Sequence, residues 1–290
     1  MTIPAPSSNR RGIIMMLSAC ALIAVTTILA KWLGTGDHAL HPFQVTAGRF
    51  CFALIALAIA AAILRPTLTR PNMPLYAVRV LAGWSGVTLM FAAVTVIPVA
   101  DATAISFLNP IFGMMLAIPL LGEKVGRWRW FAAAIGICGG VILLRPGPST
   151  FDPGALIALT AAVIMGLEVT IIKLLTRREA PMQILLMANT MGSVIAITTA
   201  SFVWITPSAE QWLAMAALGL TMLSAQVLYL QAIQAADASF VLPFSYATLV
   251  FAAVYDRLIF GATPDAVSYL GIAVILAGAG LLAWREARLR

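Results

Sequence analysis

The chain has 290 residues, of which 61% are hydrophobic and only 10% charged, and its formal net charge is +7. Soluble domains contain about 45–50% apolar and about 25% charged residues, so this composition excludes an ordinary soluble protein. The apolar residues come in runs of about 20, each long enough to cross a bilayer core roughly 30 Å thick. The basic residues cluster in the short loops between these runs. That pattern argues against nucleic acid as a partner and indicates a lipid bilayer.

In chain order, the apolar runs and the breakers between them predict ten membrane-spanning helices and leave nothing for a soluble domain. The predicted spans cover approximately residues 13–33, 43–64, 73–96, 101–121, 128–144, 154–175, 182–205, 211–233, 239–260 and 264–284. We therefore expect an all-α integral membrane protein. Most Lys and Arg residues lie in one alternate set of loops and at both termini, which predicts cytoplasmic termini and a multi-pass protein of a bacterial cytoplasmic (inner) membrane.

The two halves of the chain match each other in sequence. GIIMMLSACALIAVTTILAK aligns with GALIALTAAVIMGLEVTIIK, and HPFQV aligns with APMQI, which pairs Gln44 with Gln183. The polar pairs of the first alignment are Ser18 with Thr160, Thr26 with Glu168, and Lys31 with Lys173. We expect one five-helix copy in residues 1–145 and a second in residues 146–290. Five spans per copy is an odd number, so the second copy is inverted, as in transporters with a midplane site and alternating access.

FLNPIFGMMLAIPLLGEKVGRWRWFAAAIGICGGVILL (Phe107–Leu144) resembles the hallmark of the drug/metabolite transporter superfamily of the EamA type. That hallmark has a proline in span 4, a Gly-Glu at its cytoplasmic end and a glycine-rich span 5. HPFQVTAGRFCFA resembles the family's start of span 2, from Pro42 to Arg49. The second copy departs from the hallmark, because Gly261 is followed by Ala262 and not by glutamate.

The resemblance implies a ten-helix bundle in which spans 1–4 and 6–9 line a central cavity, while spans 5 and 10 pack outside. The small-residue motifs Gly136-x-x-x-Gly140 and Ala273-x-x-x-Ala277 predict close helix packing in spans 5 and 10. Members of the family include exporters of amino acids, aromatic ones among them. Others move nucleotide-linked or drug-like compounds.

Four charged residues lie well inside the predicted spans, where each needs a partner because a charge in hydrocarbon costs at least about 2.5–3.5 kcal/mol. They are Arg49, Arg79, Glu168 and Asp256. Their depths suggest the pairs Arg79–Glu168 and Arg49–Asp256, and the alternative is a water or backbone partner for each. Glu168 is either a permanently ionised structural partner or a titrating group that couples transport to protons. Lys31 and Lys173 are expected to snorkel to the membrane surface.

Several polar and aromatic residues are candidates for the wall of a substrate cavity, and ordinary interhelical hydrogen bonding or packing is the alternative for each. They are Ser18, Thr26, Trp84, Ser106, Phe107, Asn109, Thr160, Glu168, Gln226, Tyr229, Ser245 and Tyr246. Helix kinks are expected at Pro110 and Pro243, where freed carbonyls open the wall. This mixture of rings, hydroxyls and amides suits a neutral or amphipathic small molecule, such as a zwitterionic amino acid, better than a nucleotide phosphate.

We therefore expect an exporter of amino acids or similar metabolites that works by alternating access. The alternatives are an exporter of drug-like or other metabolites and a passive channel. An enzyme is not expected, because both histidines lie in the first outer loop and no second aspartate matches the depth of Asp256. The three cysteines show no metal-ligand spacing, and we expect no metal and no cofactor. The sequence does not determine the oligomeric state, and a monomer is compatible with it.

Overall fold

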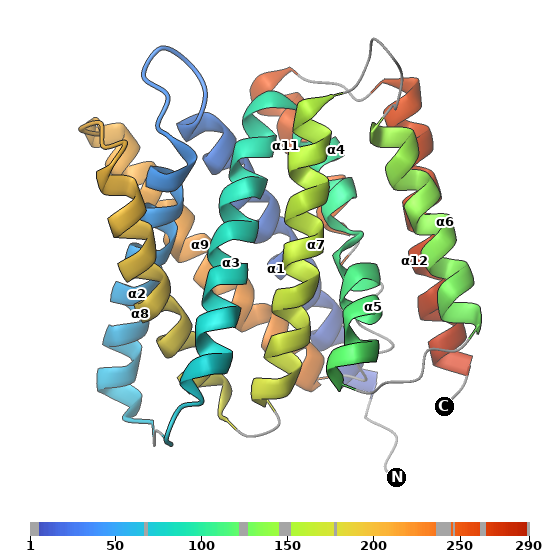
Figure 1. The fold of residues 1–290 in the computed structure, drawn as a ribbon, viewed down its shortest axis with the longest axis horizontal. Helices are drawn as coiled ribbons and strands as arrows, with labels where there is room; N and C mark the ends of the chain where they lie inside the picture. The colour runs from blue at the N-terminus through green and yellow to red at the C-terminus, as the bar shows by residue number, and fades with distance from the viewer. Residues whose placement is uncertain are drawn as a thin grey trace.

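The computed structural model describes residues 6–66, 69–121, 127–144, 152–176, 179–235, 245, 247–261 and 265–288. All regular secondary structure in these ranges is helical, as predicted (Figure 1). The helices are α1 (Pro6–Leu33), α2 (Pro42–Leu64), α3 (Met73–Val96), α4 (Val99–Ser106), α5 (Asn109–Leu121), α6 (Arg127–Leu144), α7 (Pro153–Thr176), α8 (Pro181–Ser201), α9 (Ala209–Ala235), α11 (Ala247–Phe260) and α12 (Ala266–Arg288). They run up and down between an upper and a lower end of one bundle, and α1 begins and α12 ends at the lower end.

Seven segments in the described ranges are long and apolar enough to cross a membrane. They belong to α1, α2, α3, α7, α8, α9 and the combined pair α4–α5, while α6 and α12 contain shorter apolar stretches. Together with α11, these segments occupy the positions of the ten predicted spans. Most predicted boundaries lie within four residues of the observed ones, as helix ends are usually uncertain by a few residues. α1 begins seven residues earlier than predicted, and the predicted start of the ninth span at 239 lies outside the described residues.

The fourth predicted span is broken in two. The expected helix over 101–121 is replaced by α4 and α5, with a turn at Phe107 and Leu108 between them. Proline has no backbone N–H, and its ring collides with the carbonyl four residues earlier in a continuous helix. The break lies directly before Pro110, which therefore occupies the first turn of α5, where a missing N–H costs nothing.

Helices from the first half of the chain pack mainly against helices from the second half. The most extensive contacts are those of α1 with α9, α6 with α12, α3 with α7 and α2 with α8, followed by α5 with α7, α2 with α9 and α1 with α11. Figure 1 shows α6 and α12 side by side at one flank of the bundle. The division of the chain into copies 1–145 and 146–290 remains a prediction, and this interleaved packing is compatible with it.

Gln44 and Gln183, which the internal alignment pairs, make matching contacts at opposite ends of the bundle. The buried Gln44 amide donates to the carbonyl of Ile205 at 2.6 Å and accepts from its N–H at 3.2 Å. The buried Gln183 amide accepts from the N–H of Thr69 at 2.7 Å and donates to its carbonyl at 3.1 Å. Each glutamine thus binds a connection of the other half, Gln44 at the upper end and Gln183 at the lower end.

The contact between α6 and α12 depends on a different glycine from those of the predicted motif. A Cβ on Gly139 would lie 2.8 Å from the carbonyl oxygen of Gly271 and 2.8 Å from the backbone nitrogen of Ile275. Gly136 and Gly140 instead face Ile111 and Leu108. The spacing correctly predicted that glycines of α6 make close helix contacts. The rotation of α6 about its own axis decides which glycine faces α12.

Replacing Gly139 with alanine is expected to loosen α6 from α12, because the new methyl group meets backbone atoms that cannot rotate away. We expect a loss of about 1–3 kcal/mol in the free energy of unfolding, the usual range for overpacking. Gly280→Ala in α12 is the matched control, since nothing lies within 4 Å of its Cβ position. Unfolding titrations of both variants in detergent check this, and equal stability of the two variants would contradict it.

Candidate functional site

Arg79 of α3 and Glu168 of α7 form an ion pair in the interior of the bundle, as their depths predicted. Arg79 Nη2 lies 3.8 Å from Glu168 Oε1. At 1.5 Å per residue, Arg79 lies about 9 Å above the start of α3 and Glu168 about 12 Å above the end of α7, so both occupy the same level. A Cβ on Gly83 would lie 2.7 Å from Glu168 Oε1. Glycine at this position therefore leaves the space into which the carboxylate fits.

Arg49 of α2 approaches the same pair of charges but forms no ion pair with any described residue. Its side chain is 7% exposed, and it interacts electrostatically with both Glu168 and Arg79. The guanidinium carbon lies 4.5 Å from the centre of the Phe50 ring, in a cation–π contact. Its Nε is buried and has no hydrogen-bond partner within the described part of the chain, and the same is true of Nε of Arg79. We call Arg49, Arg79 and Glu168 the charged centre.

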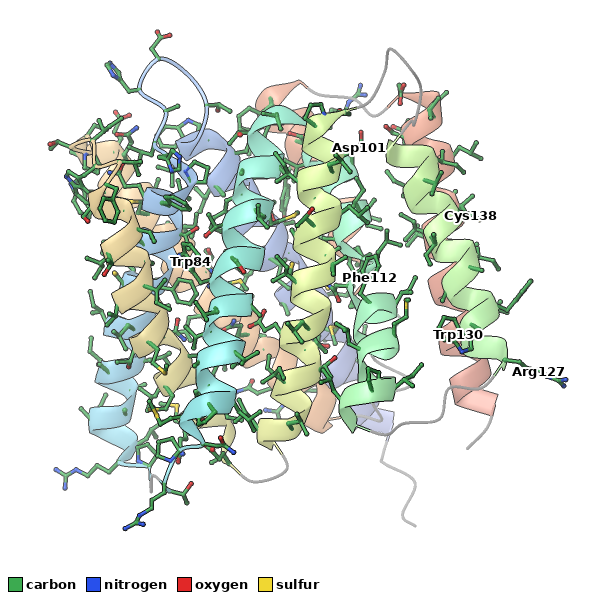
Figure 2. All side chains as sticks on the ribbon, in the orientation of Figure 1. Trp84, Asp101, Phe112, Arg127, Trp130 and Cys138 are labelled. Carbon is green, nitrogen blue, oxygen red and sulfur yellow. The ribbon has the colours of Figure 1, made fainter. Side chains whose placement is uncertain are left out.

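Trp84 of α3 lies on the side toward the α2–α8 pair (Figure 2), one residue after Gly83, whose Cβ position meets Glu168. Its ring stacks on Phe43 with 5.6 Å between centroids and packs against a small cluster that includes Phe50. The indole Nε1 is buried and has no hydrogen-bond partner among the described residues. The cluster that contains Phe50 therefore lies against Trp84, and Phe50 itself contacts Arg49, which has no ion-pair partner among the described residues.

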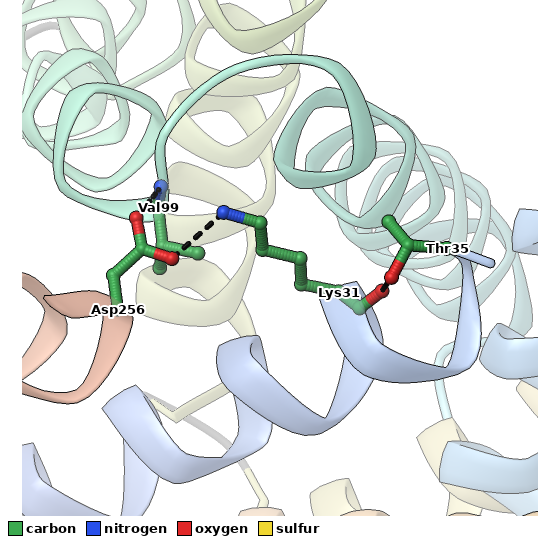
Figure 3. Close-up of polar contacts among 4 residues, drawn as sticks. All are labelled: Lys31, Thr35, Val99 and Asp256. Carbon is green, nitrogen blue, oxygen red and sulfur yellow. Dashed lines mark hydrogen bonds and ion pairs between the residues drawn. The ribbon is translucent and has the colours of Figure 1, made fainter. Parts of the chain in front are cut away.

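Asp256 of α11 pairs with Lys31 of α1 at the upper end of the bundle, and not with Arg49 as predicted (Figure 3). Lys31 Nζ lies 2.7 Å from Asp256 Oδ1, and Oδ2 accepts from the N–H of Val99 at 2.9 Å. The Lys31 ammonium also lies 4.6 Å from the centre of the Phe260 ring. The expectation that Lys31 snorkels to the surface was wrong, because α11 packs against α1 and brings a buried carboxylate within its reach.

Glu179 forms a second buried polar cluster, at the lower end, that the sequence reading missed. Its carboxylate accepts from Tyr76 Oη at 2.6 Å, from Gln183 Nε2 at 2.6 Å and from the N–H of Asn72 at 3.1 Å. The residue is only 9% exposed. Glu179 lies between two predicted spans and is not among the residues that the sequence marks as candidates. The one available signal was its spacing of four residues before Gln183, which places both on one helical face.

The hydroxyl candidates divide between buried and exposed positions. Thr26 is buried and lies 3.2 Å from the hydroxyl of Thr221 in α9, so it links α1 to α9. Its aligned partner Glu168 is the member of the charged centre. Ser18 and Thr160 are exposed, and Thr160 donates to the carbonyl of Leu156 in its own helix. A threonine satisfied in this way needs no partner from another helix.

The remaining cavity candidates occupy three regions. Ser106 donates to the carbonyl of Thr103 and, with Phe107 and Asn109, lies at the break between α4 and α5. Gln226 and Tyr229 are half-buried on α9, where Tyr229 packs near Cys20. The carbonyl of Ser245 accepts from Thr248 Oγ1 and from Cys20 Sγ. Tyr246, Pro243 and the side chains of Pro110 and Lys173 lie outside the described residues.

An open cavity of about 610 Å³ lies at the upper end, away from the charged centre. It is formed by the connection that follows α1 and the one that follows α8, and its walls include Trp32, His38, Ile205, Glu210 and Gln211. Gln211 Nε2 donates to the carbonyl of His38 and joins the two connections. Within the described ranges, no group of three or more His, Cys, Asp or Glu side chains is placed to hold a metal ion.

Comparison with known proteins identifies the chain's relatives. The model of the EamA-like transporter family matches residues 10–145 and 152–284. An S-adenosylmethionine uptake transporter of Rickettsia prowazekii is 27% identical over 266 residues, which is 91% of this chain and 90% of that protein. A riboflavin transporter of Vibrio cholerae is 25% identical over 274 residues, which is 92% of this chain and 90% of that protein.

One crystal structure covers 96% of this chain and 98% of its own, with a TM-score of 0.64. At 21% sequence identity, that likeness shows the shared fold alone. The family match extends over nearly all of both halves of the chain, including α2, α3 and α7, which carry the charged centre. This protein is an integral membrane protein and belongs to the EamA-like transporter family.

Proposed function

We propose that this transporter moves amino acids and amino-acid-derived metabolites that carry an apolar or aromatic ring. The observation that carries the proposal is the charged centre, where interior charges of both signs lie near the aromatic cluster of Phe50 and Trp84. Intramembrane ionisable groups mark substrate or ion pathways, because burying them is otherwise unfavourable. A zwitterion offers a carboxylate to arginine and an ammonium to glutamate, while its ring contacts aromatic side chains.

The relatives support this substrate class in part. S-adenosylmethionine, the substrate named for the Rickettsia relative, is an amino-acid derivative that carries a ring system. Riboflavin, named for the Vibrio relative, has rings but no amino-acid group. Interior charges of both signs can pair with the carboxylate and ammonium of an amino-acid derivative, whereas riboflavin has neither group. We therefore propose amino-acid-like metabolites as substrates first, and other ring-containing or drug-like metabolites second.

Alternating access is supported by polar contacts that join the two halves of the chain at each end of the bundle. Lys31–Asp256 and Gln44–Ile205 lie at the upper end, and Tyr76–Glu179 and Thr69–Gln183 lie at the lower end. Releasing one set while keeping the other opens the bundle to one side only. A passive channel needs a path open to both sides, so these contacts favour a carrier.

We also propose that the protein lies in a bacterial inner membrane with both termini in the cytoplasm. The first and last helices meet the same end of the bundle, and the basic residues gather in the loops that this orientation makes cytoplasmic. Export of the substrate is the direction proposed. Cells that express the chain are then expected to tolerate toxic amino-acid analogues better than control cells, whereas an uptake transporter would make them more sensitive.

Counterflow in proteoliposomes tests the substrate class. Vesicles preloaded with unlabelled L-phenylalanine or S-adenosylmethionine are expected to accumulate the labelled compound transiently and saturably, while vesicles without protein do not. Riboflavin is expected to give little counterflow. Counterflow with riboflavin alone would overturn the amino-acid assignment, and conductance without saturable counterflow would indicate a channel.

A further inference from the structure

Arg49 carries a buried positive charge that no described acidic residue neutralises. The charged centre holds two guanidinium groups and one carboxylate, and the carboxylate lies within ion-pair distance of Arg79 only. Within the described part of the chain, the buried Nε of Arg49 has no hydrogen-bond partner, and the guanidinium lies against the ring of its neighbour Phe50. The charges of the centre therefore sum to plus one.

An arginine cannot relieve this situation by losing its proton, because guanidinium stays charged in proteins. It carries five N–H donors in a planar fork that matches the two oxygens of a carboxylate. Arg49 is more than nine-tenths buried and its Nε has no partner among the described residues. Burying a guanidinium in this way costs free energy unless an anionic group pairs with it. Arg79 has no such need for a second anion, since Glu168 already faces it.

We infer that Arg49 binds the carboxylate of the transported metabolite, with the ring of that metabolite against Trp84. The inference rests on the proposed function and names the group that the site recognises. One carboxylate offsets the charge of Arg49, and the ammonium of a zwitterion can face Glu168, whereas a phosphate dianion carries twice the charge of that one guanidinium. Arg49 contacts Phe50, and Trp84 packs against the cluster that contains Phe50, so a molecule whose carboxylate and ring are a few bonds apart can reach both.

The test compares a carboxylate with its methyl ester, which keeps the ring and the ammonium but removes the negative charge. Binding of L-phenylalanine and of its methyl ester is measured on the purified full-length chain by thermal stabilisation and by inhibition of counterflow. In the wild-type protein, the acid is expected to bind roughly ten- to hundredfold more tightly than the ester, the range for charge-assisted hydrogen bonds. If the wild-type protein binds the acid and the ester equally well, this result alone overturns the inference, and no variant is needed.

Arg49→Gln is expected to lose this preference, so that acid and ester bind alike, while ester affinity changes little. Arg49→Lys keeps the positive charge but loses the planar guanidinium, and is expected to retain part of the preference for the acid. This variant replaces Arg49→Gln in the test if Arg49→Gln does not fold. Arg257→Gln is the control, because Arg257 is exposed at the end of α11. An unchanged acid-to-ester ratio in Arg49→Gln, or in Arg49→Lys where only that variant folds, would assign Arg49 a structural role. Failure of the proposed function gives a different result, because the wild-type protein would then show no counterflow with L-phenylalanine or S-adenosylmethionine.

Discussion

Lys31→Met is expected to lower the free energy of unfolding by about 3–5 kcal/mol, the cost of leaving one partner of a buried ion pair uncompensated. Asp256 is 2% exposed, and without Lys31 its carboxylate keeps, among the described residues, the N–H of Val99 as its partner. Asp256→Asn is expected to cost less, because the Lys31 side chain is 13% exposed and its long stem can carry the ammonium toward water. The order of the two effects follows from the unequal burial of the two partners.

A double-mutant cycle in detergent measures this pair. The double variant Lys31→Met/Asp256→Asn is expected to be more stable than Lys31→Met alone, because it removes the stranded carboxylate. Arg257→Gln, next to Asp256 but exposed, is the matched control and is expected to stay within about 0.5 kcal/mol of the wild type. Additive losses in the double variant would show that the ion pair contributes nothing to the folded state.

Glu168→Gln is expected to destabilise the protein and slow transport, because it leaves Arg79 and Arg49 as neighbouring buried cations with no carboxylate. The decrease in the free energy of unfolding is expected to be smaller than the roughly 3–5 kcal/mol expected for Lys31→Met. The ion pair is longer, 3.8 Å against 2.7 Å, and Glu168 is 19% exposed. Arg79→Gln/Glu168→Gln should recover part of the loss, since it removes the repulsion between the two arginines.

The pH dependence of transport distinguishes the two roles proposed for Glu168. A structural partner of Arg79 predicts slower transport with the same pH profile in Glu168→Gln. A group that carries the coupling proton predicts that the profile flattens, because glutamine does not titrate. The ion pair favours the structural role, and a flattened profile in proteoliposomes would decide for coupling.

Much of the fold follows from local sequence. Runs of about 20 apolar residues must form helices in a membrane, because every backbone polar group has to be satisfied within its own segment. Pro110 explains the break before α5 through its missing N–H. The pairing of Arg79 with Glu168 could also be predicted, because residue position along a helix determines depth and both residues lie at one depth.

Depth alone does not say which helices are neighbours or how each is rotated about its axis, and tertiary structure decided both. Depth predicted Arg49 as the partner of Asp256, but the packing of α11 on α1 brought Lys31 to it. Rotation of α6 placed Gly139 against α12 and turned Gly136 and Gly140 elsewhere. The burial of Glu179 required α3 to bring Tyr76 to the start of α8. The sequence by itself determined the helices and the depth of each charge, whereas contacts between distant segments depend on the packing of the whole bundle.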